Sequence, residues 1–164
     1  MVFLIDGYNL MHAVGILRVG LPQKPLAGAR PRFLDWLADA ARARPDTLRV
    51  VFDAQNGPAP SNEYGHRGVR VRFAFRQTAD EQIEELVRAA SVPKAAVVVS
   101  NDGAVQEAAR RRGCGGFTCQ GFVDWLLAPP RAPDDPPPPD DKPVPPPTPD
   151  EFAAWEAAFR RMKG

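Results

Sequence analysis

Four aspartates occupy positions from which their side chains could do chemistry together. Asp6 and Asp53 each end an apolar, strand-like run, Asp102 follows a third such run, and Asp80 opens a predicted helix. Ligands of open α/β sheets bind beyond the carboxyl ends of the strands, so we expect these carboxylates to converge on one patch. Clustered carboxylates repel one another unless a cation offsets their charge, and Mg²⁺ and Mn²⁺ prefer such oxygen ligands. These ions activate water and stabilise the leaving oxygen of a phosphoryl displacement.

Each aspartate taken alone also has a purely structural interpretation. Asp102 would cap the helix that follows it, and Asp80 would favour the positive start of its own helix. Asp6 and Asp53 would be turn residues. The placement that all four share favours the functional interpretation over four separate structural ones.

Thr78 and Glu81 are spaced as a capping box, in which each side chain satisfies a backbone N–H of the helix start. Such a box would fix the beginning of the helix and aim Asp80 at the strand ends. Glu84 lies one turn after Asp80 on the same helix face and is a candidate fifth acid. A solvated surface role is the alternative for Glu84.

Three further polar residues lie next to these acids in the sequence. Asn9 follows a predicted turn at Gly7 and would orient Asp6 or a bound water. Ser100 and Asn101 would do the same for the aspartate that comes directly after them. These residues are expected to support the site rather than to react.

Strand-like and helix-like stretches alternate along the chain up to residue 128. Strands are expected at 2–6, 48–53, 69–75, 94–100 and 115–120, and helices at 27–44, 78–90, 103–112 and 121–128. This alternation predicts an α/β fold with a mostly parallel sheet that is covered on both faces.

The chain changes character after residue 128. Residues 129–149 contain 12 prolines in 21 positions, which predicts a stiff, solvated linker. Residues 150–163 are typical of a short amphipathic helix, which needs a surface to dock on, either its own domain or a partner. We therefore expect a core domain at 1–128, a linker at 129–149 and a helical segment at 150–164.

The bulk composition sets wider bounds. The chain has 164 residues with 21 Lys+Arg and 20 Asp+Glu, a net charge of +1. Residues 1–128 hold 16 basic and 13 acidic residues (+3), and residues 129–164 hold 5 and 7 (−2), which is compatible with a polyanionic partner of the core. No apolar run is long enough for a membrane span, and the N-terminus is interpreted as a buried strand rather than a signal peptide. Cys114 and Cys119 are expected to point to opposite faces of a strand and not to bridge, which favours a reducing cytoplasm.

Four motifs occur in an order that resembles the NYN domains of the PIN-like nuclease superfamily, most closely their YacP-type branch, over residues 1–128. They are Asp6-Gly7-Tyr8-Asn9, Val51-Phe52-Asp53, Thr78-Ala79-Asp80-Glu81 and Ser100-Asn101-Asp102. The resemblance implies a three-layer α/β/α fold and an endoribonuclease that uses Mg²⁺ or Mn²⁺. It implies that Asp6, Asp53, Asp80 and Asp102 are the metal-binding and catalytic residues. It further implies single-stranded RNA as substrate, with translated mRNA at the ribosome as the narrower role.

The predicted strand 69–75 carries a row of basic side chains. Arg70 and Arg72 face the side opposite to its valines, and Arg76 is expected to continue the row. An arginine-lined strand face suits phosphate groups. The alternative is an edge strand that its charges protect from pairing with other chains.

The preceding segment, residues 56–68, is predicted to be a long polar loop. Loops of this length within compact domains are often functional. Tyr64 would stack on an unpaired base, and Arg67 would contact the RNA backbone.

Three other classes of protein were weighed against a nuclease. A haloacid-dehalogenase-type phosphatase would need a second acid two residues after Asp6, where Tyr8 stands. A dinucleotide-binding domain would need more glycines after the first strand. A non-catalytic RNA- or ribosome-binding adaptor is the strongest rival, and metal-dependent RNA cleavage would discriminate between the two.

Overall fold

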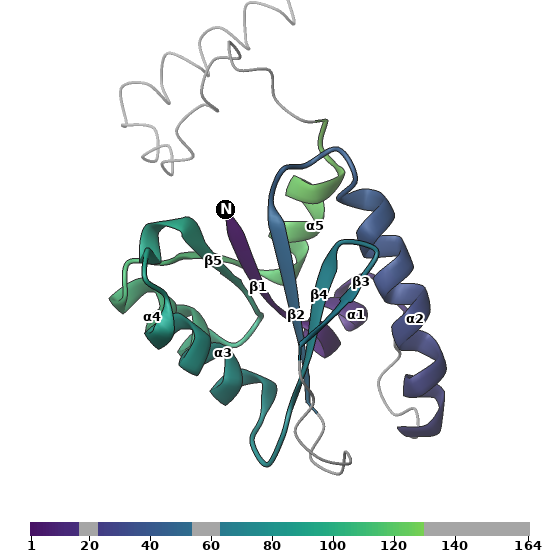
Figure 1. The fold of residues 1–164 in the computed structure, drawn as a ribbon, viewed down its shortest axis with the longest axis horizontal. Coiled ribbons are helices and arrows are strands. Elements are labelled where there is room, and N and C mark those ends of the chain that lie inside the picture. Colours follow the sequence, from purple (N-terminus) through teal and green to yellow (C-terminus); the bar gives the residue numbers. More distant parts are fainter. Residues whose placement is uncertain (17–22, 54–62, 130–164) are drawn as a thin grey trace, which may run out of the picture. The chain divides into compact units, whose positions relative to one another are not determined.

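The computed structural model describes residues 1–16, 23–53 and 63–129 (Figure 1). The strands are β1 (Val2–Asp6), β2 (Thr47–Asp53), β3 (Tyr64–His66), β4 (Val69–Ala74), β5 (Ala96–Val99) and β6 (Gly115–Phe117). The helices are α1 (Gly7–Ala13), α2 (Gln23–Ala40), α3 (Ala79–Ala89), α4 (Gly103–Arg111) and α5 (Cys119–Leu127), with a 3₁₀ turn at Pro93–Ala95. The predicted linker and C-terminal helix lie outside the described residues.

The strands form one sheet in the order β3-β4-β2-β1-β5-β6. All neighbouring pairs are parallel except β3 with β4, which is antiparallel. From β1 the chain continues through β2 and β4 towards one edge and then returns to build β5 and β6 towards the other. The strand order therefore reverses between β1 and β5, and such a switch point is where open α/β sheets bind ligands.

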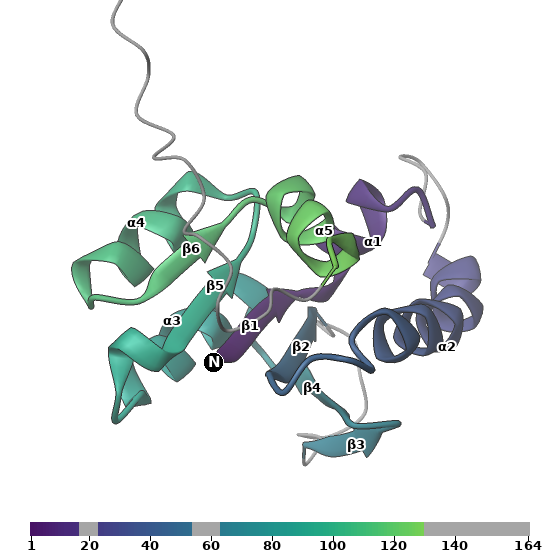
Figure 2. The same cartoon turned by 90° about the horizontal axis from the view of Figure 1, so that it is seen from above.

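Helices cover both faces of the sheet, so the fold is the expected three-layer α/β/α arrangement (Figure 2). On one face, α1, α2 and α5 bury alternate residues of the strands, such as Ile5, Val50 and Val71. On the other face, α3 and α4 bury the intervening residues, such as Leu4, Val51 and Val98. The central strands are apolar on both faces because each face has its own core.

Helix α1 begins directly at the end of β1, where the sequence had predicted a turn at Gly7. A Cβ atom at Gly7 would lie 2.4 Å from Cε1 of Phe52 and 2.9 Å from Cγ1 of Val50. Glycine lets the first turn of α1 approach the sheet closely, so this residue serves packing as well as the change of direction. No separate turn is needed because Asp6 itself caps the helix.

Strands β3 and β4 form a hairpin, which differs from the sequence-based expectations for residues 56–68 and 69–75. The strand 69–75 is not an edge strand, because β3 pairs with it and forms the edge itself. The predicted loop at 56–68 contains β3, and residues 54–62 lie outside the described part. The two residues that join the strands, Arg67 and Gly68, both have positive φ (49° and 93°), the geometry of a tight hairpin turn.

The other predicted elements occur with shifted ends. Helix α2 begins at Gln23 rather than at residue 27, and β6 ends at Phe117 because Thr118 caps α5. Cys119 thus begins a helix instead of belonging to a strand, yet it and Cys114 lie in the cores on opposite sides of the sheet and are both free thiols. No helix among the described residues is long and apolar enough to cross a membrane.

Candidate active site

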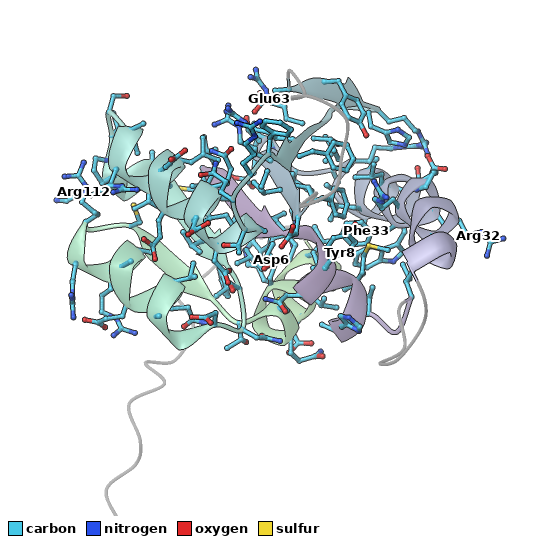
Figure 3. The ribbon with its side chains drawn as sticks, turned by 90° about the horizontal axis from the view of Figure 1, so that it is seen from below. Asp6, Tyr8, Arg32, Phe33, Glu63 and Arg112 are labelled. Atoms are coloured by element: carbon cyan, nitrogen blue, oxygen red, sulfur yellow. The ribbon has the colours of Figure 1, made fainter. Side chains whose placement is uncertain are left out.

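The candidate site lies where β1 and β5 end, at the reversal of strand order. Asp6 is the last residue of β1 and lies near the centre of the molecule when viewed from the ends of the strands (Figure 3). Asp6 is only 6% exposed. One carboxylate oxygen accepts a hydrogen bond from the backbone N–H of Asn9 (3.0 Å), and the other accepts one from Asn9 Nδ2 (2.9 Å). Asp6 is therefore both the N-cap of α1 and a buried acid at the strand end.

The pKa of Asp6 is raised to about 6, mainly by burial and in addition by the negative charges of Asp80 and Asp53. The backbone hydrogen bond from Asn9 acts in the opposite direction, because it stabilises the ionised form. A carboxyl group with this pKa keeps its proton up to about pH 6, well above the range in which a solvated aspartate ionises.

Asn9 connects the end of β1 to the end of β5. Its Nδ2 group lies 2.9 Å from Asp6 Oδ2 and 3.5 Å from Ser100 Oγ. Ser100 is fully buried, and its Oγ accepts a hydrogen bond from the backbone N–H of Asp102 (3.0 Å). The two polar side chains thus lie between two of the four aspartates, in the supporting positions that the sequence indicated.

Asp102 caps α4, because its Oδ1 accepts hydrogen bonds from the backbone N–H groups of Ala104 (2.7 Å) and Val105 (3.1 Å). Its charge is also among those that raise the pKa of Asp80. The structural and functional interpretations of this residue are therefore compatible. Asn101 does not orient Asp102 as expected, since its Oδ1 accepts a hydrogen bond from the backbone N–H of Cys119 (2.9 Å).

The predicted capping box at the start of α3 is present. Thr78 Oγ1 accepts from the N–H of Glu81 (3.2 Å), and Glu81 Oε2 accepts from the N–H of Thr78 (2.8 Å). This box fixes the first turn of α3, which carries Asp80 within hydrogen-bonding reach of the Asp6 carboxyl. Glu81 is used by the cap, whereas Glu84 adds its charge to the surroundings of Asp80.

Asp80 is the second acid whose pKa is raised. Burial is the largest cause, followed by the negative charges of Asp102, Glu84 and Asp53. Its Oδ1 atom is buried and has no hydrogen-bond partner. A buried carboxylate oxygen without a partner is costly, and it marks a position that a cation or a proton would fill.

Asp53 completes the set at the end of β2. It is half-buried, and its charge raises the pKa of Asp6, Asp80 and Tyr8. Asp80 therefore interacts with each of the other three predicted aspartates, and Asp6 interacts with Asp53 and Asp80.

The chemistry of these donors fits a hard divalent cation, because they are carboxylate oxygens that repel one another and include one buried oxygen without a partner. Within the described ranges, no group of three or more His, Cys, Asp or Glu side chains is arranged so that it could hold a metal ion as it stands. Cation binding would therefore require the carboxylates to move closer together. The charge of the cation would offset the repulsion between them.

Three of the five predicted RNA-contacting residues lie on β3 and β4. Tyr64 is 44% exposed and stacks on Phe73 with ring centres 6.4 Å apart. Arg70 is exposed and pairs with Glu63 (3.1 Å), while Arg72 is half-buried on the same face of β4. The row ends there.

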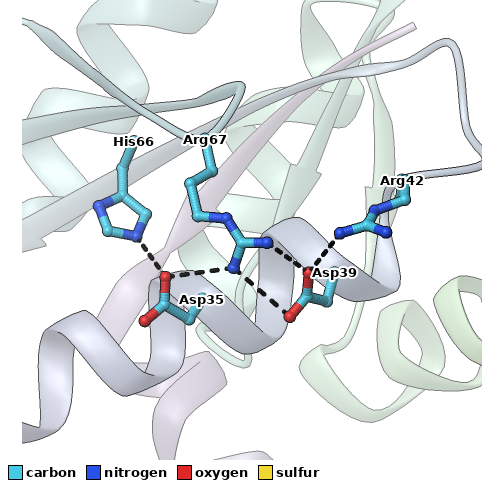
Figure 4. A network of polar contacts seen from close by, with 5 residues as sticks. All are labelled: Asp35, Asp39, Arg42, His66 and Arg67. Atoms are coloured by element: carbon cyan, nitrogen blue, oxygen red, sulfur yellow. Dashed lines mark hydrogen bonds and ion pairs between the residues drawn. The ribbon is translucent and has the colours of Figure 1, made fainter.

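Two of the predicted basic residues have surroundings that the sequence did not indicate. Arg76 does not continue the row of β4, because it lies beyond the strand with a φ of 56° and its guanidinium is 5.2 Å from the ring centre of Phe75. The guanidinium of Arg67 lies 2.7 Å from Asp39 Oδ1 and 3.4 Å from Asp35 Oδ1 (Figure 4). Arg67 is therefore already paired with two carboxylates of α2.

Two residues near the acids were not singled out from the sequence. Tyr8 packs on Phe52 with ring centres 5.2 Å apart, and its hydroxyl is influenced by both Asp53 and Arg30. Tyr8 belongs to the first of the four motifs, which was a usable signal. Arg30 lies in the middle of α2, and nothing in its local pattern distinguishes it from a solvated helix residue.

The fold and the site together define a three-layer α/β protein whose acids meet at a switch point of a mostly parallel sheet. The chain belongs to the YacP-like NYN domain family, whose model matches residues 3–130. This PIN-like nuclease family supports a ribonuclease-type function.

Two solved structures are similar to this chain. A mutant form of Rae1 (YacP) from Bacillus subtilis is 25% identical with a TM-score of 0.61, covering 76% of this chain and 74% of that chain. Another structure of Rae1 (YacP) from Bacillus subtilis is 19% identical with a TM-score of 0.54, covering 99% of this chain and 81% of that chain. No curated protein matches this chain.

Proposed function

We propose that this protein is a metal-dependent endoribonuclease that hydrolyses phosphodiester bonds of single-stranded RNA in the cytoplasm. The observation that carries the proposal is the Asp6–Asp80 carboxyl pair, with raised pKa values and a buried unpartnered oxygen at the switch point. Translated mRNA at the ribosome is the narrower substrate that we propose, on the basis of the family.

Asp6, Asp53, Asp80 and Asp102 would hold Mg²⁺ or Mn²⁺, which supplies water activation and charge stabilisation of the leaving oxygen. Asn9 and Ser100 keep the Asp6 carboxylate in a fixed orientation through the contacts described above. The raised pKa of Asp6 means that its carboxyl group retains a proton below about pH 6 in the absence of a cation. Cation binding must displace that proton, so the affinity for the cation should rise with pH up to about 6.

The test is cleavage of a labelled single-stranded RNA by the purified full chain with Mn²⁺ or Mg²⁺ and with EDTA. We expect cleavage with either metal and none with EDTA, giving products with a 5′-phosphate and a 3′-hydroxyl. RNA binding without any metal-dependent cleavage would overturn the proposal in favour of a non-catalytic adaptor. Cleavage that the Asp6→Asn and Asp80→Asn variants retain in full would show that another site or a contaminant is responsible.

A further inference from the structure

Arg30 lies on two aromatic rings beside the candidate site. Its guanidinium carbon is 5.1 Å from the ring centre of Phe73 and 5.9 Å from that of Phe52. Phe33, one turn further along α2, is fully buried and meets Phe52 edge-on with ring centres 6.2 Å apart. The buried Phe33 anchors this part of α2 to the core, so the backbone that carries Arg30 is held in place.

Arg30 has a cation–π cradle but no anionic partner among the described residues. Its Nε atom is buried and makes no hydrogen bond. Arg44 provides a contrast, because it lies 3.8 Å from the ring centre of Trp125 and also donates hydrogen bonds to the carbonyl groups of Trp125, Leu126 and Ala128. The charge of Arg44 is thus matched by the acceptors at the end of α5, whereas no residue in the described part of the chain matches the charge of Arg30.

Arg30 and Tyr8 contact the same aromatic ring beside the candidate site. Tyr8 packs on Phe52 with ring centres 5.2 Å apart, and the Arg30 guanidinium carbon is 5.9 Å from the centre of the Phe52 ring. Phe52 directly precedes Asp53 at the end of β2, so both residues lie next to this acid. Figure 3 shows Tyr8 next to Asp6, between it and Phe33.

We propose that Arg30 binds a phosphate group of the RNA backbone next to the bond that is cleaved. This inference rests on the proposed function. A cluster of aspartates repels a phosphodiester, so a cation at its rim is needed to offset the charge of the substrate. Arginine suits this role because its planar guanidinium makes bidentate hydrogen bonds to phosphate while its face stays stacked on aromatic rings.

The experiment compares Arg30→Met with Arg32→Met in the full chain. Arg32 lies on the same helix, is exposed and points away from the site in Figure 3, so it is a matched control for charge. Binding of a fluorescent single-stranded oligoribonucleotide is measured in EDTA by anisotropy at several salt concentrations. Melting temperatures are measured in parallel, and Arg30→Lys serves as the conservative variant.

We expect Arg30→Met to weaken binding roughly tenfold, as for the loss of a hydrogen bond to a charged group. It should also flatten the salt dependence by about 0.7 in the logarithmic slope, the value for one contact to single-stranded nucleic acid. Arg32→Met should change neither quantity, and Arg30→Lys should restore the slope but only part of the affinity. The melting temperature of Arg30→Met should change little, because methionine also packs on the two aromatic rings and the substitution removes no ion pair among the described residues.

Unchanged binding by Arg30→Met, or equal losses in both methionine variants, would overturn the phosphate site. A lowered melting temperature with unchanged binding would assign Arg30 to packing alone. Cleavage by the wild-type protein in Mn²⁺ separates the two proposals. Arg30-dependent binding without cleavage contradicts the proposed function and leaves the phosphate site standing, whereas cleavage that Arg30→Met leaves intact overturns only the phosphate site.

Discussion

Two groups of aspartates in this protein have opposite surroundings. At the switch point, Asp6 and Asp80 face other acids, and their pKa values are raised. At the contact of α2 with the β3–β4 hairpin, Asp35 lies 2.9 Å from His66 Nε2 and 3.4 Å from an Arg67 nitrogen, and its pKa is lowered (Figure 4). The second group shows that aspartates in this protein are paired with basic residues where α2 packs on the β3–β4 hairpin.

The contrast indicates which aspartates the fold needs as anions. In the network of Asp35, Asp39, Arg42, His66 and Arg67, each carboxylate contacts a base. The lowered pKa of Asp35 means that its ionisation favours the folded state. At the switch point, ionisation opposes folding because of burial and like charges. Acids that are retained at such a cost are candidates for function rather than for stability.

The largest expected effect is on activity. Asp6→Asn and Asp80→Asn should each lower the rate of RNA cleavage roughly 1,000-fold, because a bound cation contributes several kcal/mol to phosphoryl transfer. Asp35→Asn should leave the rate within about twofold of the wild-type value, since such surface pairs contribute little. Single-turnover cleavage in Mn²⁺ measures all three. A comparable loss in Asp35→Asn would remove the distinction between the two groups.

The second prediction concerns stability without metal. Between about pH 4 and pH 6, Asp6 ionises in the unfolded chain but keeps its proton in the folded protein, so a rise in pH lowers the free energy of unfolding. The displacement of the pKa from 3.8 to about 6 corresponds to about 3 kcal/mol, all of it lost by about pH 7. Urea unfolding in EDTA from pH 4 to pH 8 should show this loss in the wild-type protein.

Asp6→Asn is the control, because asparagine still accepts the N-cap hydrogen bond and does not ionise. The difference in unfolding free energy between the variant and the wild type should grow in favour of the variant as pH rises through this window. A difference that is independent of pH would mean that Asp6 is an ordinary solvated cap.

The third prediction concerns the cation directly. Mn²⁺ should raise the melting temperature of the wild-type protein at pH 7.5, by an amount that corresponds to about 2.7 kcal/mol at 100 times the dissociation constant. Asp80→Asn should show little of this stabilisation. The same stabilisation in wild type and variant would place the bound ion elsewhere.

The smallest effect is expected in the paired group. Asp35→Asn should change the free energy of unfolding by an amount close to the error of measurement, because its carboxylate is solvated and salt screens its partners. The change should shrink further between low salt and 0.5 M NaCl, as thermal unfolding will show. A large destabilisation that does not depend on salt would show that the hairpin contact is essential to the fold.

Local sequence signals predicted most of the fold. The capping box at Thr78, the apolar run of β5 and the alternation of β4 each depend on neighbouring residues, and each led to the right element. The elements that were predicted wrongly are those whose formation depends on contacts with residues distant in the sequence. Helix α1 begins without a turn because Gly7 packs on Phe52, and β3 forms because Tyr64–His66 pairs with β4.

The residues of the candidate site also fall into those that local sequence predicts and those that it does not. The acids stand at strand ends and helix starts, which the sequence marks, so their proximity followed from the expected topology. The surroundings of Arg30, two rings from β2 and β4 with no anion among the described residues, are set by the tertiary structure, and a helical sequence pattern does not indicate them. The ion pairs of Arg67 could not be predicted for the same reason, since the carboxylates that contact it come from α2.

The helix-capping role of Asp6 and Asp102 also has an evolutionary consequence. Asparagine caps a helix about as well as aspartate does, and a single-nucleotide change converts one codon into the other. A duplicated gene could therefore lose two of the four acids of this site by two single-nucleotide changes while its product still folded. Under the proposed function, folded members of the family that have lost activity should be easy to generate, and an aspartate at both positions should be a better marker of nuclease activity than the fold itself.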